Sequence, residues 1–183
     1  MRQFLPTDIH DVIRIQPQVF QDARGFFMET YQKQIFTQAG IPYEFVQDNH
    51  SSSKKWILRG LHYQVTHTQG KLVRAVIGEI FDVAVDLRKS SSHFGKWVGA
   101  YLSDINKEQL WIPPGFAHGF LVLSDRADVV YKTTDYYDPV GDRTIRWDDP
   151  SLGIDWPIPE GVQPLVSEKD SSGKFFNDAE VFA

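Results

Sequence analysis

The chain contains no cysteine, so it cannot form a disulfide, a thiolate-ligated zinc or iron–sulfur site, or a cysteine nucleophile. It also lacks a long apolar run. The longest one, residues 110–117, is interrupted by two prolines, whereas a helix that spans a membrane needs about 20 apolar residues. Nor is there an excess of basic residues, because 19 Lys and Arg stand against 24 Asp and Glu, a net charge of −5. We therefore expect neither a nucleic-acid partner nor a membrane partner.

The N-terminal residues reach an acid at Asp8 with no apolar segment behind it, which is not the pattern of a secretory signal peptide. We therefore expect a cytoplasmic protein. The 183 residues contain no internal repeat and no low-complexity linker, and the length suits one hydrophobic core. The sequence predicts a single domain over residues 1–183.

Apolar side chains recur mostly with a period of two. In residues 79–87, two valines and a leucine alternate with Asp82, Ala84 and Asp86, as on a half-buried strand. Similar stretches occur at residues 12–15, 43–47, 56–63, 71–77, 97–102, 119–123, 128–134 and 144–147. Turn residues separate them at short intervals, so nine or ten strands predict an all-β antiparallel sandwich or barrel. We expect helices only at residues 32–39, before Gly40, and near residues 167–170.

A polar side chain is costly to bury, so polar residues inside apolar strands are informative. In residues 57–64, alternation places Leu58, Gly60, His62 and Gln64 on one face and Arg59 on the other. If this strand lines a barrel, the imidazole of His62 projects inward. A lone strand histidine is nevertheless more often a structural residue than a catalyst.

Lys71 and Arg74 open a second strand of this kind. One interpretation is an edge strand whose charges prevent aggregation. The other is a pair of cations that holds an anionic ligand or a developing oxyanion. The sequence leaves these alternatives open.

The motif Pro113-x-Gly-x-x-His118 places a tight turn before a strand and directs an imidazole into the barrel mouth. It resembles the second signature of cupins, small β-barrels that often bind metal. Their first signature contains His-x-His, but here Gln64 stands where the second histidine is expected after His62. Two histidines do not fill a three-ligand site unless another residue such as His50 joins them, so we expect no metal.

Tyr131 and Tyr137 lie in a polar segment, residues 131–138. Their phenol groups could simply reach solvent from a strand. A functional interpretation makes one of them a general acid and the other a stacking surface for a planar base.

Seven segments of the chain resemble motifs of one family, in the family's order and over nearly the whole length. They are residues 22–29, 45–51, 58–64, 69–74, 78–86, 111–120 and 131–133. The chain is similar to the dTDP-4-dehydrorhamnose 3,5-epimerase family, cupin-type enzymes of dTDP-L-rhamnose biosynthesis. The resemblance implies a dTDP-4-keto-6-deoxy sugar as substrate, inversion at C3 and C5, and no cofactor.

The resemblance also implies catalytic roles. His62 matches the family's base and Asp170 the carboxylate that pairs with it. Lys71 matches the lysine that stabilises the enolate, and Tyr131 matches the acid on the opposite face. These residue types suit the chemistry, because loss of a proton next to a ketone leaves an oxyanion and inversion needs a second proton donor.

Further residues match the family's substrate contacts. Arg59 matches the pyrophosphate arginine, and Tyr137 matches the aromatic residue that stacks on thymine. The remaining matches are Arg24, Glu29, Gln47, Asp48, Asn49, Lys71, His118, Asp142 and Lys169. Asp142 stands where the family usually has a glutamate, so this one contact departs from the pattern. Members of the family form homodimers with exchanged N-terminal strands, and the resemblance implies the same here.

Three other functions fit parts of the sequence. A related enzyme could invert only C3 or only C5 with the same base, acid and lysine. A metal-dependent cupin is suggested by the motif at His118 alone. A non-catalytic nucleotide-sugar-binding module would keep Arg59 and Tyr137, but it would not need His62, Tyr131 and Asp170 together.

Overall fold

The computed structural model describes residues 1–183 and consists mainly of short strands. Strands and helices follow each other as β1 (Gln3–Pro6), β2 (Ile13–Gln16), β3 (Val19–Asp22), β4 (Gly25–Met28), α1 (Lys33–Gln38), β5 (Gln47–Lys54), β6 (Leu58–Gln64), β7 (Lys71–Ile77), β8 (Glu79–Asp86), β9 (Trp97–Ser103), β10 (Gln109–Ile112), β11 (Phe116–Val122), β12 (Arg126–Thr133), β13 (Asp142–Thr144) and α2 (Glu168–Ser171). A 3₁₀ turn at Phe176–Asp178 precedes the C-terminus.

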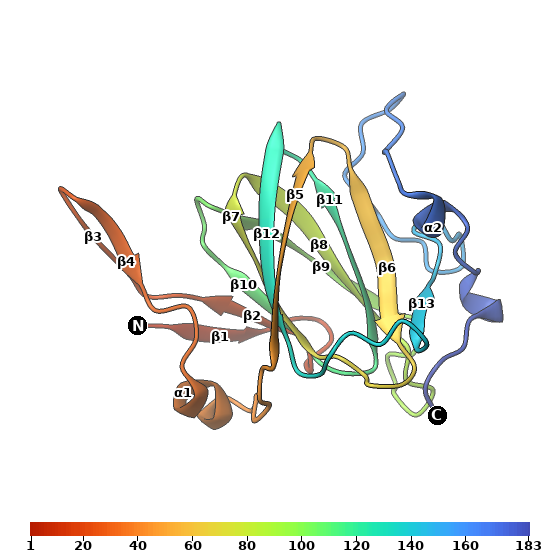
Figure 1. Ribbon diagram of the computed structural model, residues 1–183, viewed down its shortest axis with the longest axis horizontal. Helices are drawn as coiled ribbons and strands as arrows, with labels where there is room; N and C mark the ends of the chain where they lie inside the picture. Colours follow the sequence, from red (N-terminus) through yellow and green to blue (C-terminus); the bar gives the residue numbers. More distant parts are fainter.

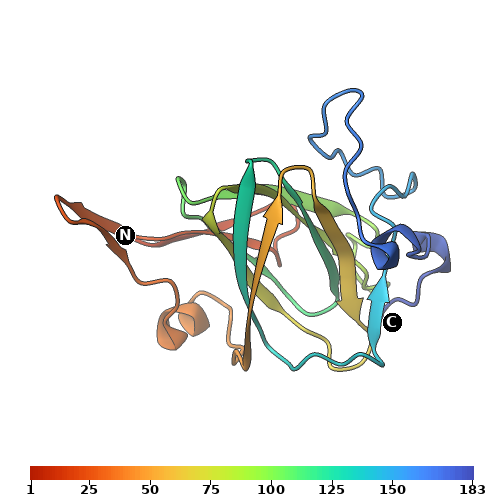
Figure 2. The ribbon, with the colours of Figure 1, turned by 45° about the horizontal axis from the view of Figure 1, so that its top comes forward.

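Two antiparallel sheets face each other and form a sandwich (Figures 1 and 2). One sheet has the order β1-β2-β10-β7-β12-β5 and the other the order β13-β6-β11-β8-β9. A cluster of 16 buried residues fills the space between them, including Val73, Phe120 and Val129. The hairpin β3–β4 forms a separate two-stranded sheet that projects away from the sandwich. The predicted all-β antiparallel sandwich is confirmed.

A second apolar cluster covers the outer face of the five-stranded sheet. Val83 and Val85 of β8 pack there with Leu152 and Trp156 of the C-terminal segment. Strand β8 is therefore buried on both faces, and the prediction that it is half-buried is wrong. Its acid Asp82, expected toward solvent, is fully buried because the opposite face of the strand is the sandwich interior.

The strands that sequence periodicity missed are short, projecting or polar. Strands β1, β3, β4 and β10 have four residues each. The strand expected at 43–47 begins only at Gln47 and runs to Lys54, and the strand expected at 144–147 lies at Asp142–Thr144. Both predicted helices, α1 and α2, are present.

A register shift in β6 changes which side chains face the interior. Arg59 lies opposite Phe120 of β11 and His62 lies opposite His118, so β6 has one extra residue between these pairs. Directly paired residues of antiparallel strands point to the same side of the sheet, and Phe120 belongs to the interior cluster. Arg59 and His62 therefore both face the interior. The prediction that they lie on opposite faces is wrong, because alternation does not continue across a β-bulge.

Two glycines permit the close approach of β6 and β11 at this bulge. A Cβ atom on Gly60 would lie 2.6 Å from Gly119 Cα, and Gly60 has a φ of +117°. Only glycine adopts such a backbone conformation without strain. The bulge thus depends on these two residues and allows β6 to present both Arg59 and His62 to the interior.

Strand β7 lies between β10 and β12 in the six-stranded sheet. It is not an edge strand, so the protective interpretation of Lys71 and Arg74 is wrong. Alternation directs these two side chains to opposite faces: Lys71 is buried, and Arg74 lies at a hollow on the outer face of the sheet. Finally, none of the helices is both long and apolar enough to span a membrane.

Candidate active site

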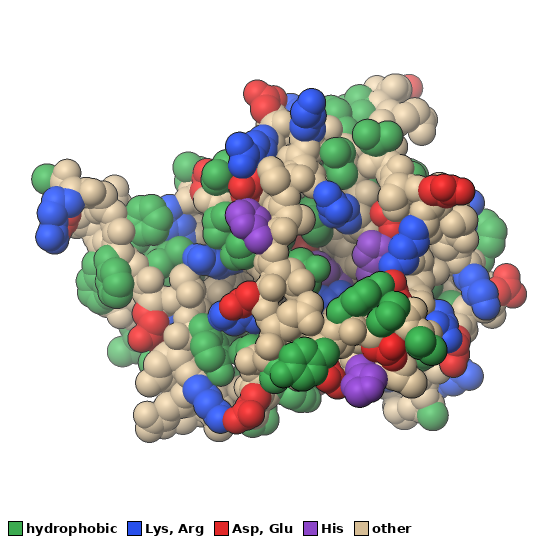
Figure 3. Space-filling model, viewed as in Figure 1, with side chains coloured by type: hydrophobic (Ala, Val, Ile, Leu, Met, Phe, Trp, Pro, Cys, Tyr) green, Lys and Arg blue, Asp and Glu red, His purple; other side chains and the backbone are tan.

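A cavity of about 110 Å³ opens between the two sheets, near the ends of β6 and β7. In the space-filling view it lies in the hollowed region between β5 and β6, where histidine and basic side chains gather (Figure 3). Its walls come from both sheets, from the segment after β12 and from α2. The lining residues are His62, Tyr63, Gln64, Thr68, Gln69, Lys71, Phe116, Tyr131, Tyr137, Asp142 and Lys169.

His62 of β6 forms a close pair with Asp170 of α2, with 2.5 Å between Nε2 and Oδ1. Asp170 is 3% exposed, and Ser167 caps the short helix by accepting a hydrogen bond from the Asp170 amide. Burial by itself raises the pKa of this carboxyl, but the hydrogen bond with His62, the charges of His62 and Lys169 and a hydrogen bond with Ser167 together outweigh it, and the pKa lies below the ordinary value. An ionised Asp170 holds Nε2–H and leaves the other ring nitrogen free to accept a proton.

Lys71 of β7 is a buried cation in the same cavity. Lys71 is 8% exposed, and its Nζ lies 3.4 Å from the carbonyl oxygen of His62. Burial lowers the pKa of Lys71 to about 8, although the nearby carboxylates Asp82 and Asp142 oppose the shift. At neutral pH the ammonium is still present, and with few protein partners it is available to an anion in the cavity.

Tyr131 lies on β12, in the sheet opposite to the one that carries His62. Its cross-strand partners are Val73 of β7 and Asn49 of β5. Burial raises the pKa of Tyr131, so the phenol remains protonated at neutral pH and can donate a proton. The imidazole and the phenol therefore approach the cavity from opposite walls.

Arg59 lies near Tyr131, toward the rim of the sandwich. Its Nε donates to Ser53 Oγ of β5 at 3.0 Å, and its charge opposes the rise of the Tyr131 pKa. The rest of the guanidinium has no hydrogen-bond partner in the protein. A guanidinium fork of this kind can bind phosphate oxygens in a bidentate manner.

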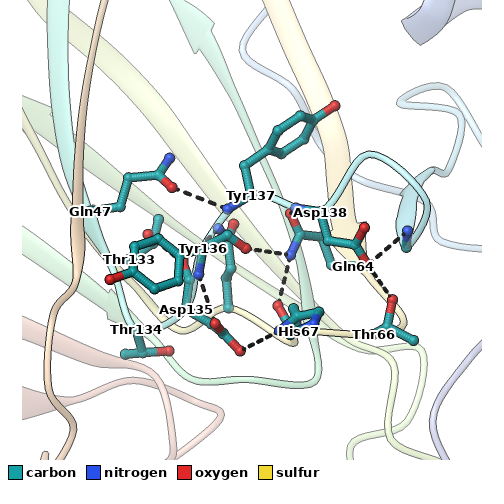
Figure 4. Close-up of polar contacts among 12 residues, drawn as sticks. Gln47, Gln64, Thr66, His67, Thr133, Thr134, Asp135, Tyr136, Tyr137 and Asp138 are labelled. Atoms are coloured by element: carbon teal, nitrogen blue, oxygen red, sulfur yellow. Dashed lines mark hydrogen bonds and ion pairs between the residues drawn. The ribbon is translucent and has the colours of Figure 1, made fainter.

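Two glutamine side chains fix the backbone at Tyr137 (Figure 4). Gln47 Oε1 accepts from the Tyr137 amide at 3.1 Å, and Gln64 Oε1 accepts from the Asp138 amide at 3.0 Å. The amide group of Gln64 also donates to the carbonyl oxygens of His67 and Tyr136. Gln64, in the place of the expected second histidine, thus holds the segment that presents the Tyr137 ring.

Asp142 of β13 connects this segment to α2. Its Oδ2 accepts a hydrogen bond from the Tyr137 hydroxyl at 3.2 Å and forms an ion pair with Lys169. Because Lys169 precedes Asp170 in α2, the ion pair also restrains the helix that carries the partner of His62. The shorter acid at this position therefore still contacts two predicted site residues.

His118 of β11 is buried behind the cavity and bonded to an acid that sequence reasoning missed. Nε2 lies 2.7 Å from Oδ1 of Asp82, which has no exposed surface. Periodicity assigned Asp82 to a solvent face, but a lone acid within the apolar run at residues 80–85 was the signal for a functional position. No group of three or more His, Cys, Asp or Glu side chains is arranged to hold a metal ion, and His50 instead pairs with Asp128.

Seven predicted contacts are not among the residues that line this cavity. Four of them, Gln47, Asn49, Arg59 and His118, lie on β5, β6 and β11. The other three lie on or next to the β3–β4 hairpin or on an outer face of the sandwich. Arg24 lies at the turn of the β3–β4 hairpin and pairs with Asp22. Glu29 follows β4 and pairs with Arg2. Asp48 points to the outer face of the six-stranded sheet, where it pairs with Lys132. Figure 1 shows the hairpin on the far side of the molecule from β6 and α2.

A base and an acid on opposite walls can take a proton from one face of a carbon and return one to the other face. The buried ammonium in the same cavity can stabilise the anion that forms between the two proton transfers. This fold and this site define the class of cupin-type epimerases.

The family model of dTDP-4-dehydrorhamnose 3,5-epimerase matches residues 6–178, and the chain belongs to this family. An enzyme of that name from Pseudomonas aeruginosa is 58% identical over 175 residues, 95% of this chain and 96% of the relative. Another, from Shigella flexneri, is 57% identical over 180 residues, 97% of this chain and 98% of the relative. The resemblance inferred from the sequence motifs is confirmed.

Solved structures agree with this assignment. The crystal structure of a dTDP-6-deoxy-D-glucose 3,5-epimerase of Legionella pneumophila, in complex with dTDP-4-keto-L-rhamnose, has a TM-score of 0.94 and 50% identity. The match covers 98% of this chain and 95% of that chain. The predicted cupin-type fold is therefore confirmed as well.

Proposed function

We propose that the chain is an isomerase that inverts C3 and C5 of dTDP-4-dehydro-6-deoxy-α-D-glucose and yields dTDP-4-dehydro-β-L-rhamnose, in dTDP-L-rhamnose biosynthesis. Membership of the epimerase family supports this activity, and so does the match to a relative solved with dTDP-4-keto-L-rhamnose. The observation that carries the mechanism is the placement of His62 and Tyr131 on facing sheets with Lys71 beside them. We infer one catalytic unit formed by residues 1–183, acting in the cytoplasm where a nucleotide sugar is metabolised.

Proton removal begins at His62. The 4-keto group makes the hydrogens on C3 and C5 acidic, because the resulting carbanion is an enolate whose charge lies on the ketone oxygen. His62 takes the proton, and the ionised Asp170 stabilises the imidazolium that forms. A positioned base of this kind contributes about 10²–10⁴-fold to the rate. The ammonium of Lys71 stabilises the enolate oxygen.

Tyr131 completes the inversion by donating its phenolic proton to the opposite face of the same carbon. Its burial supports this role, because a raised pKa keeps the phenol protonated until the enolate forms. The sequence of steps is then repeated at the second carbon. Without a donor on that face, His62 would return the proton to the side from which it came and the configuration would be retained.

The nucleotide part of the substrate binds toward the rim. We propose that Arg59 binds the pyrophosphate and that the ring of Tyr137 stacks on thymine, held in place by Gln47 and Gln64. Tyr137 is 57% exposed, which leaves one face of the ring available for stacking. The other proposed contacts on this chain are Asn49, Lys71, His118, Asp142 and Lys169.

The experiment for this site follows deuterium uptake from D₂O into the dTDP-4-keto-6-deoxy sugar by NMR. We expect His62→Ala to abolish uptake at both carbons while dTDP binding stays nearly unchanged. His93→Ala is the matched control, because His93 lies outside the cavity. Full uptake in His62→Ala would remove His62 from the role of base.

We further propose a homodimer in which the β3–β4 hairpin of each chain contributes to the site of the other. Arg24, Glu29 and Asp48 do not reach the cavity of their own chain, and the hairpin exposes the aromatic rings of Phe20, Phe26 and Phe27. Exposed apolar surface of this extent marks an interaction site. Exchange of N-terminal strands would cover it and bring Arg24 to a partner's nucleotide.

Complementation tests this assembly. Arg24→Ala and His62→Ala variants are purified separately and mixed after mild dissociation. If Arg24 acts in the partner's site, mixed dimers contain one site with both native residues, and activity rises above that of either variant alone. A monomer in sedimentation analysis, or no recovery in verified mixed dimers, would contradict the proposal.

A further inference from the structure

The interior of the sandwich holds a second imidazole–carboxylate pair, formed by His118 and Asp82. Both residues are almost completely buried, with exposed fractions of 5% and 0%. The two side chains come from neighbouring strands of the five-stranded sheet, β11 and β8, and His118 Nε2 lies 2.7 Å from Asp82 Oδ1. The proposed proton transfers use the first pair, His62 and Asp170, and give Asp82 no role.

The burial of Asp82 lowers the stability of the folded protein. Its second carboxylate oxygen, Oδ2, is buried and has no hydrogen-bond partner. A buried carboxylate that uses only one oxygen loses hydration without full compensation. A purely structural residue at this position in β8 would be apolar, like its neighbours Val83 and Phe81.

The position of the pair connects it to the chemistry. The ring centroid of His118 lies 6.4 Å from that of Tyr131. His118 and Asp82 also interact electrostatically with Lys71, and His118 with His62. The pair therefore lies behind the residues that handle the sugar, within the same polar interior.

The geometry points to Asp82 as a positioning residue that fixes the tautomer and orientation of His118 for the sugar. This inference rests on the proposed epimerase function. With Asp82 Oδ1 as the acceptor, the hydrogen bond requires a proton on Nε2 of His118. Burial lowers the pKa of His118 and keeps the ring neutral, so Nδ1 carries a lone pair.

Nδ1 has no protein partner in the structure and is free to accept a hydrogen bond. Lys71 and Arg59, the two cations at the proposed sugar site, can only donate. A sugar hydroxyl needs an acceptor as well as donors for a single orientation, and His118 in the Nε2–H tautomer supplies one. The loss of that tautomer would turn an acceptor into a donor and misplace the ring relative to Lys71 and Tyr131.

The first test is spectroscopic. ¹⁵N–¹H correlation spectra of histidine-labelled protein distinguish the two neutral tautomers, and His118→Asn identifies the His118 signals. We expect the Nε2–H tautomer in the native protein. In Asp82→Asn we expect the Nδ1–H tautomer, because the asparagine amide donates to Nε2. The Nδ1–H tautomer in the native protein, or an unchanged tautomer in Asp82→Asn, would overturn the inference.

The second test is a double-mutant cycle on kcat/KM. We expect Asp82→Asn to lower kcat/KM by about 10- to 100-fold, the effect of one charge-assisted hydrogen bond, with dTDP affinity unchanged. The double variant Asp82→Asn, His118→Asn should be no slower than His118→Asn alone, since Asp82 acts through His118. If the reduction in kcat/KM of the double variant equals the product of the reductions in the two single variants, Asp82 acts independently of His118 and the inference is refuted.

Asp86→Asn is the matched control. Asp86 also lies on β8 and is also fully buried, but it pairs with Arg88 at the end of the strand. We expect it to lower stability without changing the His118 tautomer or kcat/KM. If the native protein does not catalyse deuterium uptake from D₂O into the substrate, the proposed function fails. The tautomer of His118 is measured without substrate, so that result does not depend on the activity.

Discussion

Replacing Lys71 by methionine should make the protein more stable and inactive. The pKa of Lys71 is lowered from 10.5 to about 8 by burial. At 1.36 kcal/mol for each pKa unit, the charged form costs the folded state about 3 kcal/mol relative to the unfolded chain. Methionine has a similar length and no charge, so Lys71→Met should raise the free energy of unfolding at pH 7 by up to about 3 kcal/mol. Activity should be lost, because the enolate loses its cation.

The stability gained by Lys71→Met should depend on pH. Below about pH 8, Lys71 is charged in both states and the full cost applies. Between pH 8 and 10.5 the unfolded chain binds more protons than the folded one, so the native protein gains stability as pH rises. The advantage of Lys71→Met should therefore shrink to about 1 kcal/mol near pH 9.5.

Urea unfolding of both proteins at pH 7, 8, 9 and 9.5, at one fixed protein concentration, measures this difference. Lys89→Met, at an exposed lysine, is the control and should change stability by less than about 0.5 kcal/mol. If Lys71→Met is less stable than the native protein at pH 7, or if its advantage does not change with pH, then Lys71 is not a buried, desolvated cation and the reasoning is refuted.

Three further predictions concern the reaction and the fold. The kcat/KM profile should fall above pH 8, because the proton that Lys71 loses near that pH carries the charge that stabilises the enolate; a flat profile to pH 9.5 would contradict this. Tyr131→Phe should still exchange substrate hydrogen for deuterium through His62 but should return sugar of the original configuration, as seen by NMR. Epimerised product at the native rate would exclude Tyr131 as the acid. Gly60→Ala should lower the free energy of unfolding by about 3 kcal/mol or more, because its Cβ would meet Gly119 Cα at 2.6 Å, and an unchanged urea midpoint would speak against a rigid bulge.

Alternating periodicity identified strands β7, β8, β9 and β12 because most of their core-facing side chains are apolar. It failed at β5, whose eight residues include no apolar side chain. The interior face of β5 carries Asn49 and Ser53, and Ser53 accepts a hydrogen bond from Arg59 instead of packing in a hydrophobic core. A strand that lines a binding site thus loses the pattern by which strands are identified.

Motif resemblance located His62, Lys71, Tyr131 and Asp170, and the structure brings these four together. It could not indicate how Arg59 and His62 come to share a face, because a bulge depends on the pairing of β6 with β11. It gave Asp82 no role, because β8 was expected to expose the face of Asp82 to solvent and that face instead lies in the interior of the sandwich.

The most direct measurement of the central claim is the number of deuterium atoms in the product. The native protein is incubated with dTDP-4-dehydro-6-deoxy-α-D-glucose in D₂O, and the product is trapped by reduction of the 4-keto group. We expect deuterium at both C3 and C5 in a sugar of L configuration. Deuterium at C3 alone would identify a single-carbon epimerase, and deuterium at neither carbon would contradict proton transfer by this site.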